Sequence, residues 1–173
     1  MTARLEDTGT AGAARTVDGG VEWRREPYSV STNPERLDIA VTAAFLATTY
    51  WAPEISESVV RRSIANSIVF GLYLDDQQIG FAKVVTDRAT FAWVGDVFVL
   101  DDYRGLGLGL WLMRCVLAHP ELQELRRWLL ASTSARGLYE RLGFKALAAP
   151  ERFMEIADPD VHRRQRARAE GTG

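Results

Sequence analysis

Residues 103–109 read Tyr103-Arg104-Gly105-Leu106-Gly107-Leu108-Gly109 and lie between a predicted strand that ends at Leu100 and a predicted helix over residues 109–117. Glycines at alternate positions let the backbone approach a ligand closely. The unpaired amides at the start of the helix, with the positive end of its dipole, suit an anion such as a pyrophosphate. Arg104 adds a charged donor beside them. Glycine turns between a strand and a helix also arise for purely steric reasons, so the loop by itself leaves both interpretations open.

Two phosphate-binding motifs of known mechanism do not fit this loop. The dinucleotide fingerprint needs G-x-G-x-x-G after the first strand of a parallel unit, whereas these glycines are spaced G-x-G-x-G and follow antiparallel strands. The Walker pattern needs Lys and then Ser or Thr after its last glycine, and Leu110 and Trp111 stand there instead.

The chain before the loop predicts two helices and a run of antiparallel strands. Asn33 and Pro34 are the N-cap and first residue of a helix that should end near Trp51, because Pro53 follows. A second helix opens near Ser56. Val, Ile and aromatic residues predict a short strand over 28–31 and a meander over 68–74, 79–86 and 91–100.

After the loop the apolar period changes. We expect helices over residues 109–117 and 135–142, and strands over 128–131, 144–148 and, as a possible addition, 154–156. Antiparallel strands followed by alternating strands and helices make an α+β or mixed α/β fold, with helices covering one sheet.

The two ends of the chain differ in composition from its middle. Residues 1–20 hold little apolar side chain to bury and are predicted to be a disordered leader. Residues 157–173 are polar and basic, and are either a solvated, fraying tail or a docking arm. One domain is therefore expected over residues 21–156.

The composition narrows the function classes. The chain has 173 residues, 47% of them hydrophobic, and 21 Lys and Arg against 23 Asp and Glu, as in a single soluble domain without the positive field of a nucleic-acid binder. A single cysteine, Cys115, excludes an internal disulfide, and with only two histidines no metal site is expected. No run approaches the length of a membrane helix, so the prediction is a cytoplasmic protein.

A second pattern lies downstream of the glycine loop, in Ala135-Arg136-Gly137-Leu138-Tyr139-Glu140-Arg141-Leu142-Gly143-Phe144. Residues 104–109 resemble the Arg/Gln-x-x-Gly-x-Gly/Ala acyl-CoA motif of the GNAT superfamily of N-acetyltransferases. Residues 135–144 are similar to that family's Ala-x-x-x-Tyr-x-x-x-Gly-Phe segment. The order and separation of the two agree with the family, and the resemblance spans about residues 28–156.

The resemblance implies a GNAT-like fold, with a central mixed sheet, splayed strands and helices on both faces, and it implies acetyl-CoA as the cofactor and coenzyme A as product. The strand before the loop would pair with the pantetheine arm, the loop would hold the pyrophosphate, and Tyr139 would lie beside the thioester sulfur. Where the family often has an Asn that contacts pantetheine, this chain has Ser132. The implied cofactor-binding residues are Val97, Phe98, Val99, Arg104, Gly105, Leu106, Gly107, Leu108, Gly109, Leu110, Ser132 and Tyr139.

Acyl transfer to an amine needs a donor for the developing oxyanion, an acid for the departing thiolate and an acceptor for the amine proton. The amide of Val99 is a candidate oxyanion donor, and Tyr139, whose ordinary pKa is about 10, is the candidate acid. Asp96 is the one acid in the apolar strand, expected on the face of Phe98 and Val94. Its carboxylate either attracts a cationic amine and passes on its proton, or makes a structural hydrogen bond at a bend.

Two other reactive side chains are assigned to structure. His119 ends a helix before Pro120, where a cap is favoured over a base. Cys115 falls inside a helix beside Leu112 and Val116, so we expect it in the core. This disfavours an acyl-cysteine intermediate and favours direct transfer within a ternary complex.

Aromatic side chains mark the candidate acceptor site. In GNAT proteins the first two helices and the strand before the loop border the acceptor, which implies Tyr50, Trp51, Phe70 and Trp93 here. Such a pocket would hold an ammonium by cation–π attraction. For Phe70 and Trp93, an ordinary place in the core is at least as well supported.

The leading hypothesis is therefore an N-acetyltransferase that acts on the primary amine of a small molecule. The alternatives are a non-catalytic acyl-CoA-binding regulator, which the Ser132 departure and the missing clear base keep open, and a peptide or protein acetyltransferase aided by the basic tail. GNAT proteins often form dimers through their C-terminal strands, so a homodimer is also open.

Overall fold

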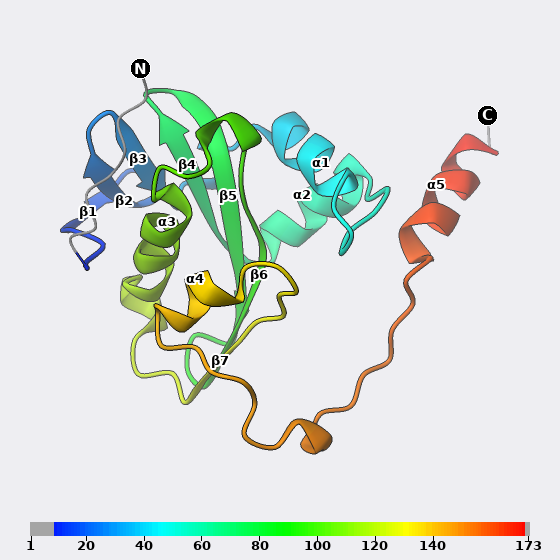
Figure 1. Cartoon of the computed structure of the whole chain (residues 1–173). Helices are drawn as coiled ribbons and strands as arrows, with labels where there is room; N and C mark the ends of the chain where they lie inside the picture. The colour runs from blue at the N-terminus through cyan, green and yellow to red at the C-terminus, as the bar shows by residue number, and fades with distance from the viewer. Residues whose placement is uncertain (1–8, 172–173) are drawn as a thin grey trace.

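In the computed structural model, which describes residues 9–171, one seven-stranded sheet runs in the order β1-β2-β3-β4-β5-β6-β7 (Figure 1). Neighbouring strands from β1 to β6 pair antiparallel, and β6 pairs with β7 in parallel. The strands are β1 (Ala14–Val17), β2 (Gly20–Arg25), β3 (Tyr28–Ser31), β4 (Ile68–Leu74), β5 (Gln77–Thr86), β6 (Phe91–Val99) and β7 (Arg127–Leu129). The predicted meander and mixed sheet are confirmed.

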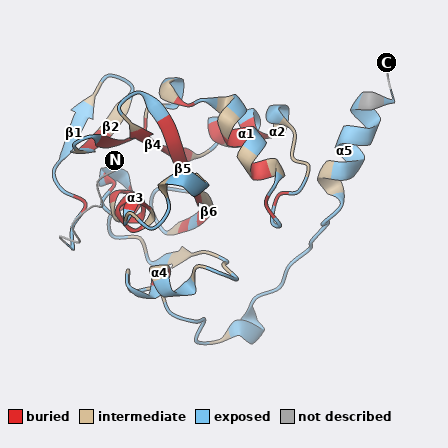
Figure 2. Ribbon diagram, turned by 45° about the horizontal axis from the view of Figure 1, so that its top comes forward, coloured by how far each residue is buried: buried red, intermediate tan, exposed pale blue. Residues whose placement is uncertain are grey.

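Helices cover both faces of this sheet, as predicted (Figures 1 and 2). On one face α1 (Ile39–Ala47) and α2 (Glu57–Ala65) bury Leu46 and Val60 against Phe81 and Phe98. On the other face α3 (Leu108–Leu117) buries Trp111 in the larger core cluster, which also contains Phe70. The short α4 (Arg136–Glu140) follows β7. None of the helices in the described part of the chain is both long and apolar enough to cross a bilayer.

The helix predicted to start at Asn33 is divided into two. Asn33 does accept a hydrogen bond from the Glu35 amide, but this turn ends as the 3-10 helix η1 (Pro34–Arg36). Asp38 then caps α1 by accepting from the Val41 amide at 3.0 Å. The break exists because the Asp38 side chain offers the backbone a second N-cap.

The prediction of a disordered leader over residues 1–20 is wrong for the part of this segment that the structure describes. β1 pairs with β2, and the Ala11 carbonyl accepts a 2.9 Å hydrogen bond from Trp111 Nε1 on α3. Val21 and Trp23 on β2 supply apolar side chains of a strand, with Trp23 completely buried, and could have revealed this hairpin. The part of the leader at residues 1–8 lies outside the described residues.

The C-terminal strands are also absent: in the described part of the chain, residues 144–148 and 154–156 form no strand. Phe144 and Leu147 instead line a cavity of about 550 Å³ together with Trp128 of β7. Met154 and Ile156 are fully exposed. The tail, for which the sequence left a solvated tail and a docking arm open, contains α5 (Val161–Glu170), which lies beyond α1 and α2 (Figure 1). Arg163 of α5 lies 3.6 Å from Glu54.

His119 caps the 3-10 helix η3 (Pro120–Leu122) at its N-terminus rather than the end of the preceding helix, where the cap was expected, and its burial gives a testable pH dependence. The ring is buried, edge-on to Phe70, and Nδ1 accepts a hydrogen bond from the Glu121 amide at 3.2 Å. Burial lowers the pKa of His119 below its ordinary value; Glu121 opposes this and Arg88 adds to it. The unfolded chain therefore binds more protons below about pH 6.5, and stability should fall as the pH drops from there towards the lowered pKa.

Urea unfolding of the wild type and His119→Asn at about pH 7.5 and about pH 5.5 checks this expectation. Asn keeps the cap, as Asn33 does in η1, but cannot titrate. The variant should start from a lower midpoint, because it loses ring packing, and should lose less stability on acidification. His162→Asn on α5 is the control and should behave as the wild type. Equal losses in the wild type and His119→Asn would contradict the assignment.

Candidate active site

The site begins where β6 leaves β7. The two strands pair only from Phe91 opposite Arg127 to Trp93 opposite Leu129, whereas β6 continues to Val99. Against β5, Lys83 faces Gly95 and Phe81 faces Phe98, so β6 holds one extra residue and bulges. The predicted separation of the two strands is confirmed, and the bulge places Asp96 next to the point where they separate.

The bulge also sets which side chains face which helices. Asp96 has a φ of 53°, a left-handed conformation that is uncommon outside glycine. Val94 packs in the core cluster of α3, whereas Phe98 packs in that of α1 and α2. Asp96 shares the face of Phe98, as predicted, but Val94 lies on the opposite face. Strict alternation fails because the extra residue shifts the phase of the strand.

The backbone of β6 presents two valines to the splayed side. The Leu100 amide donates to the Ile79 carbonyl of β5 at 2.8 Å, so alternation directs the backbone groups of Phe98 to β5 and those of Val97 and Val99 to the opposite edge. The Phe98 ring stacks on Phe45, with 4.0 Å between ring centres. Val97 and Val99 thus remain candidates for contact with pantetheine, and Phe98 does not.

The glycine loop takes up the conformation that its sequence suggests. Gly105 and Gly107 have φ values of 76° and 84°, and Gly107 is the N-cap of α3 without a side-chain cap. The first amides of α3, those of Leu108, Gly109 and Leu110, precede the first residue that can bond within the helix, since the Trp111 amide donates to the Gly107 carbonyl. This is the arrangement that binds anions.

The third glycine lies where α3 meets β6 and α4. A Cβ on Gly109 would lie 3.4 Å from Leu138 Cδ1 of α4 and 3.8 Å from Val99 Cγ2 of β6, which are ordinary van der Waals contacts. The start of α3 is therefore next to the second motif. Leu106 packs against the core from the loop, and the side chains of Leu108 and Leu110 are buried.

Arg104 stabilises the loop through two contacts of its guanidinium group. Its Nε donates to the Val99 carbonyl at 3.1 Å, and its Nη2 lies 2.9 Å from the exposed carboxylate of Asp101. The guanidinium is thus held on the strand end, where it supports the turn rather than lying over the glycine amides.

The second motif places Tyr139 on α4. The side chain is nearly buried, with its ring edge-on to Phe144, and no described residue forms a hydrogen bond with its hydroxyl. Burial raises the pKa of Tyr139, and the nearby Tyr50 raises it further. A raised phenol pKa keeps the proton in place for donation. Ser132 accepts a 3.1 Å hydrogen bond from the Ala135 amide and so holds the start of α4.

The loop between α1 and α2 brings two of the predicted acceptor residues to Asp96. Trp51 Nε1 donates to Asp96 Oδ1 at 3.2 Å, and Tyr50 packs edge-on against Trp51. The Tyr50 hydroxyl accepts from Thr133 Oγ1 at 2.8 Å, and therefore links this loop to the segment that precedes α4. Tyr50 and Trp51 remain 61% and 44% exposed, so both can meet a ligand.

Sequence reasoning missed Lys83. Its Nζ lies 2.7 Å from Asp96 Oδ2 and donates to Ser63 Oγ of α2 at 2.6 Å. A Cβ on Gly95 would touch both Lys83 Cε and Trp93 Nε1, so Trp93, which is 39% exposed, lies beside this ion pair. A lysine among the apolar residues Ile79, Phe81 and Val85 of one strand was the available signal.

The prediction that Phe70 borders the acceptor is wrong, and its alternative place in the core is confirmed. Its side chain is completely buried and packs against Trp23 and His119 in the core on the α3 face. Cys115 is equally buried, as predicted, and burial raises the pKa of its thiol. Neither side chain lies among the residues that surround Asp96.

Comparison with known proteins identifies the family to which this chain is similar. A family model described as an acetyltransferase (GNAT) domain matches residues 65–146. A GNAT-family structure from Xanthomonas campestris is 44% identical over 78% of this chain and 96% of its own, with a TM-score of 0.76. A candidate acetyltransferase structure from Deinococcus radiodurans is 26% identical over 80% and 95% of the two chains, with a TM-score of 0.65.

A curated relative from Gibberella zeae, named as a candidate acetyltransferase, is 29% identical over 71% of this chain and 82% of its own length. The matched domain contains the splayed strand, the glycine loop, Tyr139 and Asp96. The chain belongs to the GNAT family of acetyltransferases and is an acyltransferase.

Proposed function

We propose that the protein transfers an acetyl group from acetyl-CoA to the primary amine of a small molecule, by direct attack within a ternary complex. The observation that supports this best is the set of contacts around the splay: Trp51 on Asp96, Tyr50 on Thr133, and Tyr50 close enough to Tyr139 to affect its pKa. These contacts bring a carboxylate, a protonated phenol and exposed aromatic rings to one place.

Acetyl-CoA fits the neighbouring backbone. The amides of Leu108, Gly109 and Leu110 suit its pyrophosphate, and the edge of β6 at Val97, which faces away from β5, suits the amides of its pantetheine arm. When bound, acetyl-CoA supplies a thioester whose carbonyl carbon an amine can attack.

The proton balance assigns roles to two side chains. Asp96 attracts the acceptor as an ammonium and takes its proton, directly or through water, so that the amine nitrogen becomes nucleophilic. A C–N bond then forms as the C–S bond breaks, and Tyr139 Oη donates its proton to the departing thiolate. The Val99 amide, on the edge that faces away from β5, is the proposed donor to the carbonyl oxygen.

A thiol-release assay with acetyl-CoA tests the proposal against monoamines, polyamines, amino acids, aminoglycosides and short peptides. We expect saturable release of coenzyme A with at least one small amine, and thermal protection of the protein by acetyl-CoA alone. Protection without release from any amine or peptide would support the regulatory alternative. Release with peptides only would support protein acetylation and overturn the small-molecule assignment.

A further inference from the structure

The ion pair between Lys83 and Asp96 lies largely inside the protein. Their side chains are 17% and 13% exposed, and the 2.7 Å separation joins β5 to the bulge of β6. Lys83 reaches α2 as well, through Ser63, while Trp51 holds the other carboxylate oxygen of Asp96. Three elements around the sheet therefore fix the orientation of one carboxylate.

A contribution to the stability of the fold does not explain this ion pair. Half-buried ion pairs contribute little net stabilisation, because desolvation of the two charges offsets their attraction. Asp96 in addition holds a left-handed φ of 53° within a strand, a strained conformation of the kind that clusters at active sites. An apolar pair would fit the surrounding core, which contains Phe81 and Phe98, at least as well.

The Asp96 carboxylate keeps hydrogen-bonding capacity for a ligand. A carboxylate offers about four acceptor positions, of which Trp51 and Lys83 occupy two. Trp51 contacts Asp96, Tyr50 packs against Trp51, and Trp93 lies beside Gly95, so three aromatic side chains that are partly open to solvent lie near this carboxylate. The carboxylate can thus receive an ammonium while Lys83 holds it from behind.

We propose that Lys83 is a positioning residue for acetyl transfer. Its ammonium group, which Ser63 of α2 holds in place, keeps the Asp96 carboxylate in the orientation that receives the amine of the acceptor. This inference rests on the proposed function, because it assigns Asp96 to the acceptor. Lys83 itself does not touch the reacting atoms. Its effect should therefore appear in the amine step and not in the binding of acetyl-CoA.

Steady-state kinetics of Lys83→Met test the proposal with an amine that the wild type accepts. We expect kcat/KM for the amine to fall by a factor on the order of 100, the loss that misplacement of a reacting group produces. The dissociation constant of acetyl-CoA should remain that of the wild type. Lys83→Arg, which keeps a charged donor, should restore a large part of kcat/KM.

A double-mutant cycle separates positioning from a merely structural role. If Lys83 acts through Asp96, then Lys83→Met should cost little further activity in an Asp96→Asn background. Multiplicative losses in the cycle would overturn the proposal. Ser63→Ala, which removes only one contact of Lys83, provides a milder variant should Lys83→Met fold poorly, and it should reduce kcat/KM in the same direction. Unchanged kinetics in Ser63→Ala and Lys83→Met would also overturn it.

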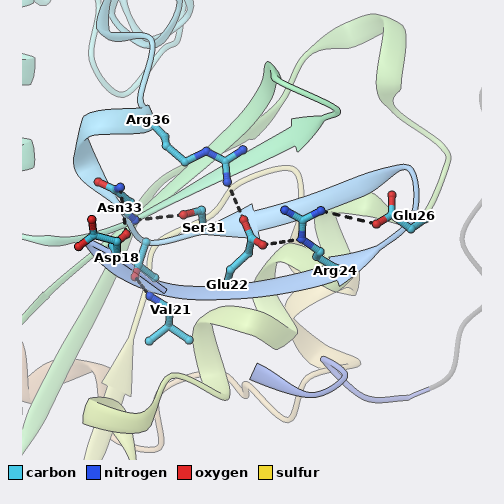
Figure 3. A network of polar contacts seen from close by, with 9 residues as sticks. Asp18, Val21, Glu22, Arg24, Glu26, Ser31, Asn33 and Arg36 are labelled. Carbon is cyan, nitrogen blue, oxygen red and sulfur yellow. Dashed lines mark hydrogen bonds and ion pairs between the residues drawn. The ribbon is translucent and has the colours of Figure 1, made fainter. Parts of the chain in front are cut away.

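The chain offers a matched control in the ion pair of Glu22 and Arg36 (Figure 3). This pair is also 2.7 Å apart and half-buried, but it joins β2 to η1, far along the sheet from Asp96. Arg36→Met should lower thermal stability and leave kcat/KM unchanged. If the wild type releases no coenzyme A with any amine, the proposed function fails. If the wild type releases coenzyme A and Lys83→Met has the same kcat/KM for the amine, only the positioning role fails.

Discussion

Tyr139→Phe is expected to lower kcat by a factor of about 100 or more, the range that a general acid contributes, while the dissociation constant of acetyl-CoA changes little. The Tyr139 ring is buried against Phe144, and Phe preserves that packing. The only loss is the hydroxyl, whose raised pKa keeps it protonated at neutral pH. Removing it takes away the proposed proton donor to the thiolate, while the ring that packs beside the proposed cofactor site stays in place.

Single-turnover kinetics and acetyl-CoA titration by fluorescence measure the two quantities separately. Tyr50→Phe is the matched control, since it removes a neighbouring hydroxyl that accepts from Thr133 and has no proposed role as acid. Its kcat should fall much less than that of Tyr139→Phe. Full activity of Tyr139→Phe across the pH range would falsify the acid assignment.

Gly107→Val should weaken the binding of acetyl-CoA by a factor of about 10 or more. A left-handed backbone costs an L residue about 1–2 kcal/mol, and about 1.4 kcal/mol corresponds to a factor of ten in affinity. Gly107 holds a φ of 84° at the N-cap of α3. In the free protein the valine can relax out of this conformation, but the loop must regain it to direct the first amides of α3 at the pyrophosphate.

Isothermal titration with acetyl-CoA measures the loss, and Gly12→Val supplies the comparison. Gly12 has a φ of 87° with open space around it, on the N-terminal segment rather than in the loop. It should show similar local strain without loss of affinity. Equal affinities for the wild type and Gly107→Val would show that the loop amides do not bind the cofactor.

The sequence predicted those parts of the site whose chemistry is encoded over a few neighbouring residues. The left-handed turns at Gly105 and Gly107 follow from glycine alone, and the helix that carries Tyr139 follows from its own pattern. The strand β4 was predicted with the bounds Ile68–Leu74 that the structure gives it. Predictions failed where pairing with a distant segment decides, as for β1, which needs β2 beside it.

Phe70 illustrates a second kind of failure. Its strand was predicted correctly, but the face to which the side chain points depends on which helices pack where, and Phe70 faces Trp23 and His119. The strand predicted over residues 144–148 failed for the same reason, because Phe144 is drawn to Tyr139 and to the cavity beside Trp128. An apolar residue in the sequence predicts that its side chain will be buried, but it does not predict which side chains it will pack against.

By itself the sequence determined the fold class and the glycine turn before α3, because periodicity and backbone freedom are properties of short segments, whereas the candidate acid Tyr139 came from the resemblance to the GNAT family. Only the tertiary structure decided the surroundings of Asp96. One extra residue in β6 relative to β5 reverses the alternation of side chains, and it brings Asp96 to Lys83, 13 positions earlier in the chain, and to Trp51, 45 positions earlier. Such contacts are set by register and packing between distant segments, which no local pattern contains.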